Sequence, residues 1–335
     1  MNKTIIVILS LFLILFVNIS PALAVNNPRN TYEIRSGDTL WKIAQTYGIT
    51  INDLNSINGL QSDLLVVGQK LRVPIMYQVV AGDTLWKLAQ SFNSSVPLIR
   101  TANGLTSNVI YVGQKLKIIP TKLTMDGQFV LMTRDQFRDW LFNQKFTRKI
   151  TYFQEHHTWW PSYSDFNGSN HFAWMYKMKD LHVKEMGWSD ISQQLTVFPD
   201  GKVVLGRPFN TPPQGSFGLL NKAVMPSIEA EALAIENVGN FDEGHDQMTP
   251  EQRETIITVA ALLSIKFGLT PSVDTIQYHH WWDMNTGERV LDKSEGHAVK
   301  TCPGTGFFGG NSTTDAKNDF YPLVRNKMQE ILSTM

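Results

Sequence analysis

The chain has 335 residues, of which 42% are hydrophobic and 18% charged, and its 30 basic and 30 acidic residues cancel. This composition is typical of globular domains, and the length accommodates two or three of them. Because the chain has no net charge, no overall field attracts nucleic acid or an anionic membrane. We therefore expect no nucleic-acid partner.

The first 24 residues have the pattern of a secretory signal peptide. Lys3 precedes an apolar run from Ile5 to Val17, and the sequence Ala22-Leu23-Ala24 follows as a cleavage motif. An uncleaved anchor is the alternative, but the run is shorter than the ~18–20 apolar residues that a spanning helix needs. We expect a protein that is secreted or held in the cell wall, with no membrane span once residues 1–24 are cleaved.

A repeat occupies residues 32–75 and 77–120. Tyr32 and Tyr77 begin the two copies 45 residues apart, and both copies contain "GDTLWK" and "VGQKL". Each copy predicts the order strand, helix, helix, strand. In the first copy Asp38 or Thr39 is placed to cap the first helix, whose buried face holds Leu40, Ile43 and Ala44.

These two copies closely resemble LysM domains, through "SGDTLWKIA", "INGL" and "VGQKLRVP" and their counterparts in the second copy. The resemblance implies a small βααβ fold that binds glycans containing N-acetylglucosamine, as in peptidoglycan or chitin. Two such sites on one chain raise the avidity for a polymer. By analogy the glycan contacts are Gly37, Asp38, Thr39 and Leu40 in the first copy and Gly82, Asp83, Thr84 and Leu85 in the second.

Residues 121–335 form the larger part of the chain and alternate strand and helix patterns. Helices are expected at 133–144, with Thr133 or Asp135 as N-cap, at 249–268 between Thr249 and Gly268, and near the end of the chain. Strands are expected in "KITYFQEHHT", "LAIENVGNF" and "TIQYHH", and a hairpin at 194–208. This order indicates an α/β domain with a central mixed sheet flanked by helices.

Several residues that bind metals well lie at the ends of these expected strands. They are His156, His157, His279, His280, His297 and Cys302. Catalytic zinc is held by three imidazole, thiolate or carboxylate ligands and keeps a fourth position open. Adjacent strand residues face opposite sides of a sheet, so only one histidine of each pair is expected to face a metal. Cys302 is the one cysteine of the chain. Besides a metal-bound thiolate, it can be a buried inert thiol or a link between chains.

Residues 121–335 resemble the zinc-dependent N-acetylmuramoyl-L-alanine amidases, which share a fold with phage amidases and peptidoglycan recognition proteins. The matching segments are "EHHT", "GWSDISQQLTVFPDGKVVLGRPFN", "IENVGNFD", "YHHWWD" and "KTCPG". The resemblance implies one Zn²⁺ held by His156, His279 and Cys302. It further implies that Lys300 stabilises the oxyanion that forms when an activated water attacks the amide.

The chain departs from this family pattern at two places. Many members have an acid/base tyrosine where this chain has Gln193, which cannot exchange a proton near neutral pH. Glu236 is a candidate general base in its place. The segment between His280 and Lys300 is longer than in phage relatives, and it makes His297 an alternative ligand to His279 and His280.

The sequence thus predicts a secreted, monomeric hydrolase of peptidoglycan that cleaves the amide between N-acetylmuramic acid and L-alanine. The first alternative is a recognition protein of the same fold without catalysis. The second is a glycosidase, which needs a pair of carboxylates that no comparable motif supplies. His171, His182 and His245 are expected to be hydrogen-bonded or exposed, and Trp159, Trp160, Trp281 and Trp282 to lie in the core or in groove walls.

Overall fold

The computed structural model describes residues 30–215 and 229–334 of the chain. The predicted signal peptide lies outside these residues. Among the described residues, no helix is both long and apolar enough to cross a membrane.

Each copy of the repeat folds as two helices beside a two-stranded antiparallel sheet. The first contains β1 (Thr31–Glu33), α1 (Leu40–Tyr47), α2 (Ile51–Asn58) and β2 (Lys70–Arg72), and the second contains β3 (Ile75–Gln78), α3 (Leu85–Ser91), α4 (Val96–Asn103) and β4 (Lys115–Ile118). The Thr39 side chain accepts a hydrogen bond from Lys42 N and so caps α1, whereas Asp38 accepts from Tyr32 Oη and Arg35 N. Thr39 is therefore the cap, and the βααβ prediction is confirmed.

The rest of the chain forms a seven-stranded mixed sheet in the order β11-β7-β10-β8-β9-β6-β5. Its strands are β5 (Thr124–Asp126), β6 (Phe129–Met132), β7 (Tyr152–His157), β8 (Leu195–Val197), β9 (Val203–Leu205), β10 (Ala232–Asn237) and β11 (Ile276–Tyr278). Strands β11, β7, β10 and β8 are parallel, and the remaining neighbours are antiparallel. The expected mixed sheet is confirmed.

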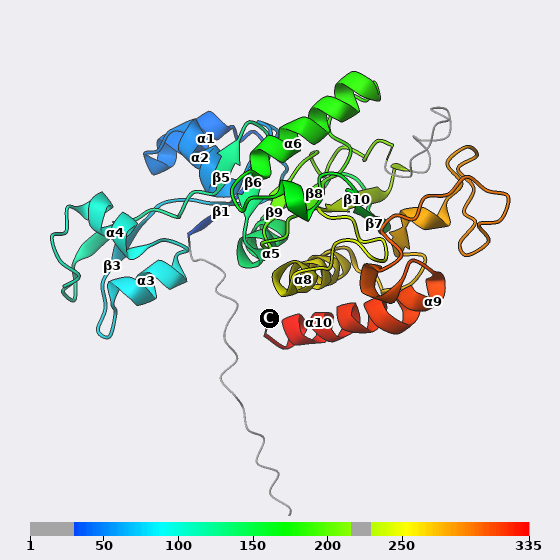
Figure 1. Cartoon of the computed structure of the whole chain (residues 1–335). Helices are drawn as coiled ribbons and strands as arrows, with labels where there is room; N and C mark the ends of the chain where they lie inside the picture. The colour runs from blue at the N-terminus through cyan, green and yellow to red at the C-terminus, as the bar shows by residue number, and fades with distance from the viewer. Residues whose placement is uncertain (1–29, 216–228, 335) are drawn as a thin grey trace, which may run out of the picture.

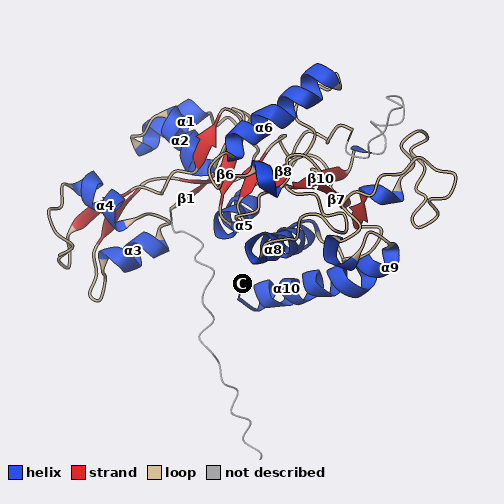
Figure 2. Cartoon of the chain, viewed as in Figure 1, coloured by secondary structure: helices blue, strands red, loops and turns tan. Residues whose placement is uncertain are grey.

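Helices cover both faces of this sheet, as Figures 1 and 2 show. They are α5 (Arg134–Asn143), α6 (His171–Asp180), α8 (Pro250–Phe267), α9 (Thr313–Asp315) and α10 (Tyr321–Thr334). Helix α6 packs over one face, and α5, α8 and α10 pack over the other (Figure 1). The open part of the α6 face lies over β10, β7 and β11, and it carries polar side chains.

The predicted helix ends are confirmed, with one choice settled. Thr133 caps α5 in a capping box with Gln136, and Asp135 lies in the first turn instead. Thr249 caps α8, and Gly268 ends it in the left-handed conformation with φ of 68°. Helix α8 is buried on several sides because it lies between the sheet and α10.

One expected strand ends earlier than predicted. β11 stops at Tyr278, and His279–Trp281 form a short 3₁₀ turn instead of continuing the strand. The turn lets the fully buried Trp281 stack on Tyr278 and donate from Nε1 to Asn311 O. His279 and His280 therefore point in different directions because they lie in a turn that packs Trp281, and not because they alternate along a strand.

Polar contacts through Asp200 join the hairpin between β8 and β9 to α6. His171 Nε2 lies 3.0 Å from Asp200 Oδ2, and Lys202 Nζ lies 2.8 Å from the same atom. Burial opposes ionisation of Asp200, but the bonds from His171 and Lys202 outweigh it and lower the carboxyl pKa to about 2. His171 is thus hydrogen-bonded, as expected.

Asp200→Asn is expected to reduce the free energy of unfolding by about 2 kcal/mol at pH 7 and by roughly half as much at pH 3. The folded-state pKa lies below the unfolded one, so this stabilisation is present above pH ~4 and is lost as the pH falls toward 2. Urea unfolding at both pH values measures the change. Asp180→Asn, at an exposed pair with Lys184, is the control and should cost less than ~0.5 kcal/mol. A loss for Asp200→Asn that is equal at both pH values contradicts the assignment.

Candidate metal centre

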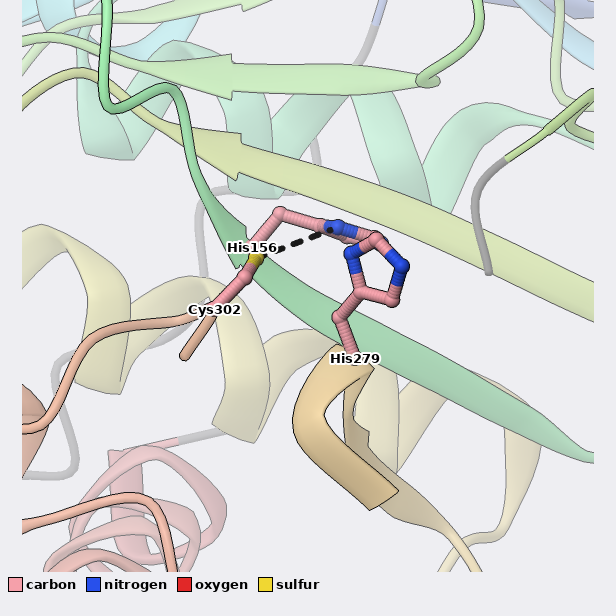
Figure 3. Close-up of side chains that lie close together, drawn as sticks. All are labelled: His156, His279 and Cys302. Atoms are coloured by element: carbon pink, nitrogen blue, oxygen red, sulfur yellow. Dashed lines mark hydrogen bonds between the residues drawn. The ribbon is translucent and has the colours of Figure 1, made fainter. Parts of the chain in front are cut away.

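Three buried side chains meet at the carboxyl ends of β7 and β11. They are His156, the neighbouring His279 and Cys302, with exposed fractions of 3%, 4% and 5%. One possible ligand atom from each lies within 4.8 Å of the other two. Figure 3 shows the three side chains converging from separate segments of the chain. Of the six candidates from the sequence, the structure brings these three together.

The chemistry and spacing of this set fit a zinc ion. Two imidazoles and one thiol are the donors that zinc prefers, and tetrahedral ligands at ~2.0–2.3 Å from zinc stand roughly 3.3–3.8 Å apart. Cys302 Sγ lies 3.5 Å from His156 Nδ1 (Figure 3), and the ring centres of His156 and His279 lie 4.8 Å apart. The zinc-ligand assignment itself remains a prediction.

The register of the sheet explains why His156 faces the centre. In the paired strands, His156 lies beside Glu236, and Glu236 lies beside Thr196. Residues paired in this way have side chains on the same face of a sheet. The three form a polar row across the open face, and Glu236 Oε1 lies 3.9 Å from His156 Nδ1.

His157 lies on the opposite face and supports the centre from behind. Its Nδ1 accepts a hydrogen bond from Phe241 N, and its own backbone N–H donates to Cys302 Sγ at 3.4 Å. Burial lowers the pKa of His157 to about 4, so its ring is neutral and Nδ1 is free to accept. The sequence predicted that His157 points to the other side of the strand or supports the site, and the structure shows both.

His280 and His297, the alternatives to His279, have other partners. His280 N donates to Cys302 O at 2.7 Å, and its Nδ1 lies 2.6 Å from Lys300 O, so His280 holds the segment that carries the cysteine. His297 Nδ1 pairs with Asp283 Oδ2 at 2.9 Å. The 3₁₀ turn directs His279 toward the cluster and leaves His280 to anchor the cysteine segment.

Burial favours the uncharged forms of the groups in the cluster. It lowers the pKa of His156 well below its usual value, and the neighbouring His279 and Lys300 lower it further. It also raises the pKa of the Cys302 thiol well above its usual value. A bound dication favours the thiolate, because it adds a positive charge beside the sulfur.

Glu236 is partly exposed beside the cluster, with 18% of its side chain accessible. Burial raises its pKa to about 8, Lys300 opposes this, and Glu155 adds to it. Glu155 itself is fully buried and accepts from Asn237 Nδ2 at 2.8 Å. Because it precedes His156 on β7, Glu155 points to the other face of the sheet from Glu236.

Lys300 is exposed at the rim of the cluster. Its charge affects the pKa values of His156, His157, Glu236 and Cys302. Lys300 lies two residues before Cys302 in the chain, and its action on a substrate stays a prediction.

The remaining sequence candidates lie elsewhere. Gln193 is fully buried and donates from Nε2 to Thr196 Oγ1, so its amide hydrogen is engaged within the protein. His182 Nδ1 accepts from Ser192 N, and His245 is exposed. Trp281 and Trp282 are buried as expected, but Trp159 and Trp160 are 63% and 50% exposed.

In the repeats, Leu40 and Leu85 are core residues with exposed fractions of 6% and 2%. Gly37 and Gly82, at the turns before the first helices, have φ of 85° and 86° and no heavy atom within 4 Å of a Cβ placed on them. Asp38 and Asp83 each accept a hydrogen bond from a tyrosine of the first strand, and Thr39 and Thr84 cap the helices. Of the predicted glycan contacts, the glycines and threonines are therefore the most accessible.

Comparison with known proteins identifies the repeats. The LysM domain family matches residues 32–74 and 77–118. The two repeats are LysM domains. One relative, the probable peptidoglycan endopeptidase LytE of Bacillus subtilis, is 60% identical over 43 residues, which are 13% of this chain and 13% of that protein. The N-acetylmuramoyl-L-alanine amidase sle1 of Staphylococcus haemolyticus is 49% identical over 43 residues, again 13% of each chain. The chain thus spans about an eighth of the length of these relatives.

Solved structures are similar over about half of this chain. The amidase LysC from Clostridium intestinale is 23% identical with a TM-score of 0.33, covering 49% of this chain and 82% of that chain. Drosophila PGRP-LB is 19% identical with a TM-score of 0.33, covering 46% and 84%. At these identities the likeness concerns the fold alone. The expected order is confirmed: two LysM domains precede an α/β domain with a seven-stranded mixed sheet.

Proposed function

We propose that the protein is a zinc-dependent N-acetylmuramoyl-L-alanine amidase, which hydrolyses the amide between N-acetylmuramic acid and L-alanine in peptidoglycan. The observation that carries this proposal is the buried group of His156, His279 and Cys302 at the open face of the sheet. Glu236 Oε1 lies 3.9 Å from His156 Nδ1, and the exposed Lys300 lies two residues before Cys302 in the chain. Such a set is typical of metal-assisted hydrolysis.

The residues of the chain have separate tasks in this reaction. When bound by His156, His279 and Cys302, zinc supplies Lewis-acid activation of water and of the carbonyl group. The Lys300 ammonium group binds the negative charge that develops on the carbonyl oxygen. Glu236 takes up or delivers the proton that the leaving amine needs, because its carboxyl group lies beside the cluster, 3.9 Å from His156 Nδ1.

The LysM domains hold the enzyme on the glycan of its substrate. In this proposal residues 1–24 direct export, residues 32–75 and 77–120 bind glycan through the loops before α1 and α3, and residues 121–335 catalyse. We propose that the mature protein acts as a monomer at the cell wall. Two weak glycan sites on one chain give an avidity above either site alone.

Removal of the metal is expected to abolish cleavage but not wall binding. After treatment with a chelator, release of free L-alanine amino termini from sacculi should fall to background, and added Zn²⁺ should restore it. Sedimentation with sacculi should persist, because the LysM domains lie outside the cluster. Full cleavage by protein from which all metal has been removed would refute the zinc-dependent mechanism.

A recognition protein without catalysis is the second candidate. It is favoured by Gln193, whose amide is committed to Thr196 and supplies no acid or base. In that case the protein sediments with sacculi and retains zinc but releases no peptide. A glycosidase is disfavoured because Glu155 and Glu236, the two glutamates beside the cluster, point to opposite faces of the sheet. New reducing sugar ends would be the product of such an enzyme.

A further inference from the structure

The first LysM domain is packed against the α/β domain through polar pairs in which its own residues are buried. Arg72, on β2, is 4% exposed and lies 3.0 Å from Asp139 of α5. Gln69 is also 4% exposed, and its Nε2 donates to Gln144 Oε1 at 2.8 Å. Buried charges and amides of this kind are stable only when their partner is in place. Both pairs therefore require one fixed arrangement of the two domains.

The loop after α2 adds backbone contacts to the same interface. Gln61 Nε2 donates to Gln128 O and Gly206 O at 3.0 and 2.9 Å, so one side chain joins two segments of the large sheet. Leu123 N, just before β5, donates to Ser56 O of α2 at 2.8 Å. The chain thus returns to the first LysM domain after it has left the second.

The second LysM domain offers a direct comparison, because it has the same fold without this contact. A Cβ on Gly59, which ends α2, would lie 2.9 Å from Leu123 Cδ1 and 3.2 Å from Val130 Cγ1. Gly104 is the matching residue after α4, and no heavy atom of the described residues lies within 4 Å of its Cβ position. Their φ values are 57° and 62°, so both have the left-handed conformation that disfavours alanine. Only the atoms around the two glycines differ.

The two LysM domains are placed differently relative to the large sheet. Figure 1 shows α1 and α2 against the large domain near β5 and β6, whereas β3, α3 and α4 project away from it. The second domain meets the first, where Asn30 Nδ2 donates to Phe92 O. Gly37 and Thr39 of the first domain remain exposed, so docking leaves the proposed glycan loop open.

We propose that the first LysM domain is a fixed part of the hydrolytic unit, and that it sets the register of a glycan strand relative to the His156, His279 and Cys302 site. The second domain is the appended one, and it contributes avidity. This inference rests on the proposed function for its substrate, a polymeric glycan strand with stem peptides. A rigidly held site positions a polymer at one distance from the reacting bond, whereas a mobile tether only raises local concentration.

The test compares Gly59→Ala with Gly104→Ala, and Gln69→Ala with Gln114→Ala, in the full chain. Gln69 and Gln114 make the same turn bond, to Val66 N and Tyr111 N, and only Gln69 also bonds to Gln144. We expect Gly59→Ala and Gln69→Ala to lower the Tm of the large domain by about 5 °C or more. The control variants Gly104→Ala and Gln114→Ala should lower it by less than about 2 °C. Each pair controls for the local cost of the substitution.

Activity provides the second measurement. The ratio of the rate on insoluble sacculi to the rate on a soluble muropeptide should fall about fivefold or more for the variants at residues 59 and 69, with their partners near the wild type. Equal Tm shifts within each pair, or ratios unchanged by all four variants, would overturn the proposal. If Gly59→Ala does not fold, the glutamine pair decides. If no variant and no wild-type sample cleaves either substrate, the proposed function fails, while the Tm comparison still decides whether the domain is docked.

Discussion

Cys302→Ser is expected to lose bound zinc and to retain less than about 1% of the amidase activity. A serine hydroxyl is a much poorer zinc ligand than a thiolate, and even residues outside the first coordination sphere cost 10–100-fold in activity or affinity when mutated. Cys302 is 5% exposed, and serine has nearly the same volume, so the fold should persist. The metal content of the purified variant and the rate of L-alanine amine release measure the two effects.

The chain offers matched controls for this substitution in its other histidines. His297→Gln should keep zinc and most activity, because His297 pairs with Asp283 instead of facing the cluster. His279→Gln should behave like Cys302→Ser. If His297→Gln loses zinc while His279→Gln retains it, the ligand set is wrong.

Lys300→Met is expected to lower kcat by about 100-fold or more while zinc content and KM stay close to the wild type. The positive charge contributes when negative charge develops on the carbonyl oxygen, so its loss is felt in the transition state more than in substrate binding. Methionine keeps much of the length of the side chain and removes the charge. Steady-state kinetics on a soluble muropeptide separate kcat from KM.

Lys293→Met is the control for a general change of charge. Lys293 is an exposed lysine of the same segment between His280 and Cys302. It should leave kcat within about twofold of the wild type. A similar loss of kcat in both variants would show that Lys300 acts through the overall positive charge of the surface and not by contact with the reacting bond.

The sequence by itself determined most local elements and the caps of helices α5 and α8. Thr133, Thr249 and Gly268 are caps whose chemistry acts within one turn of a helix, so neighbouring residues suffice to place them. The βααβ repeats were equally accessible, because each copy closes its core within about 45 residues and the motif occurs twice. The alternation of a strand also predicted that His156 and His157 face opposite sides of the sheet.

Only the tertiary structure decided which of the later histidines joins the cluster. Alternation along β11 was the wrong argument there, since burial of Trp281 converts the end of the strand into a turn. His280 then bonds to Cys302 O and Lys300 O, contacts between residues 20 or more positions apart that no local pattern specifies.

The same limit applies to the domains. The copies of the repeat have nearly the same sequence signature, yet Gly59 is packed against Leu123 and Val130 while Gly104 faces open space. Local sequence specifies the fold of each LysM domain because its contacts are short in range. The surfaces of α5 and the large sheet determine which copy docks. The residues that form these surfaces follow both copies in the sequence. Long-range packing therefore determined the assembly of this protein, and local chemistry determined its parts.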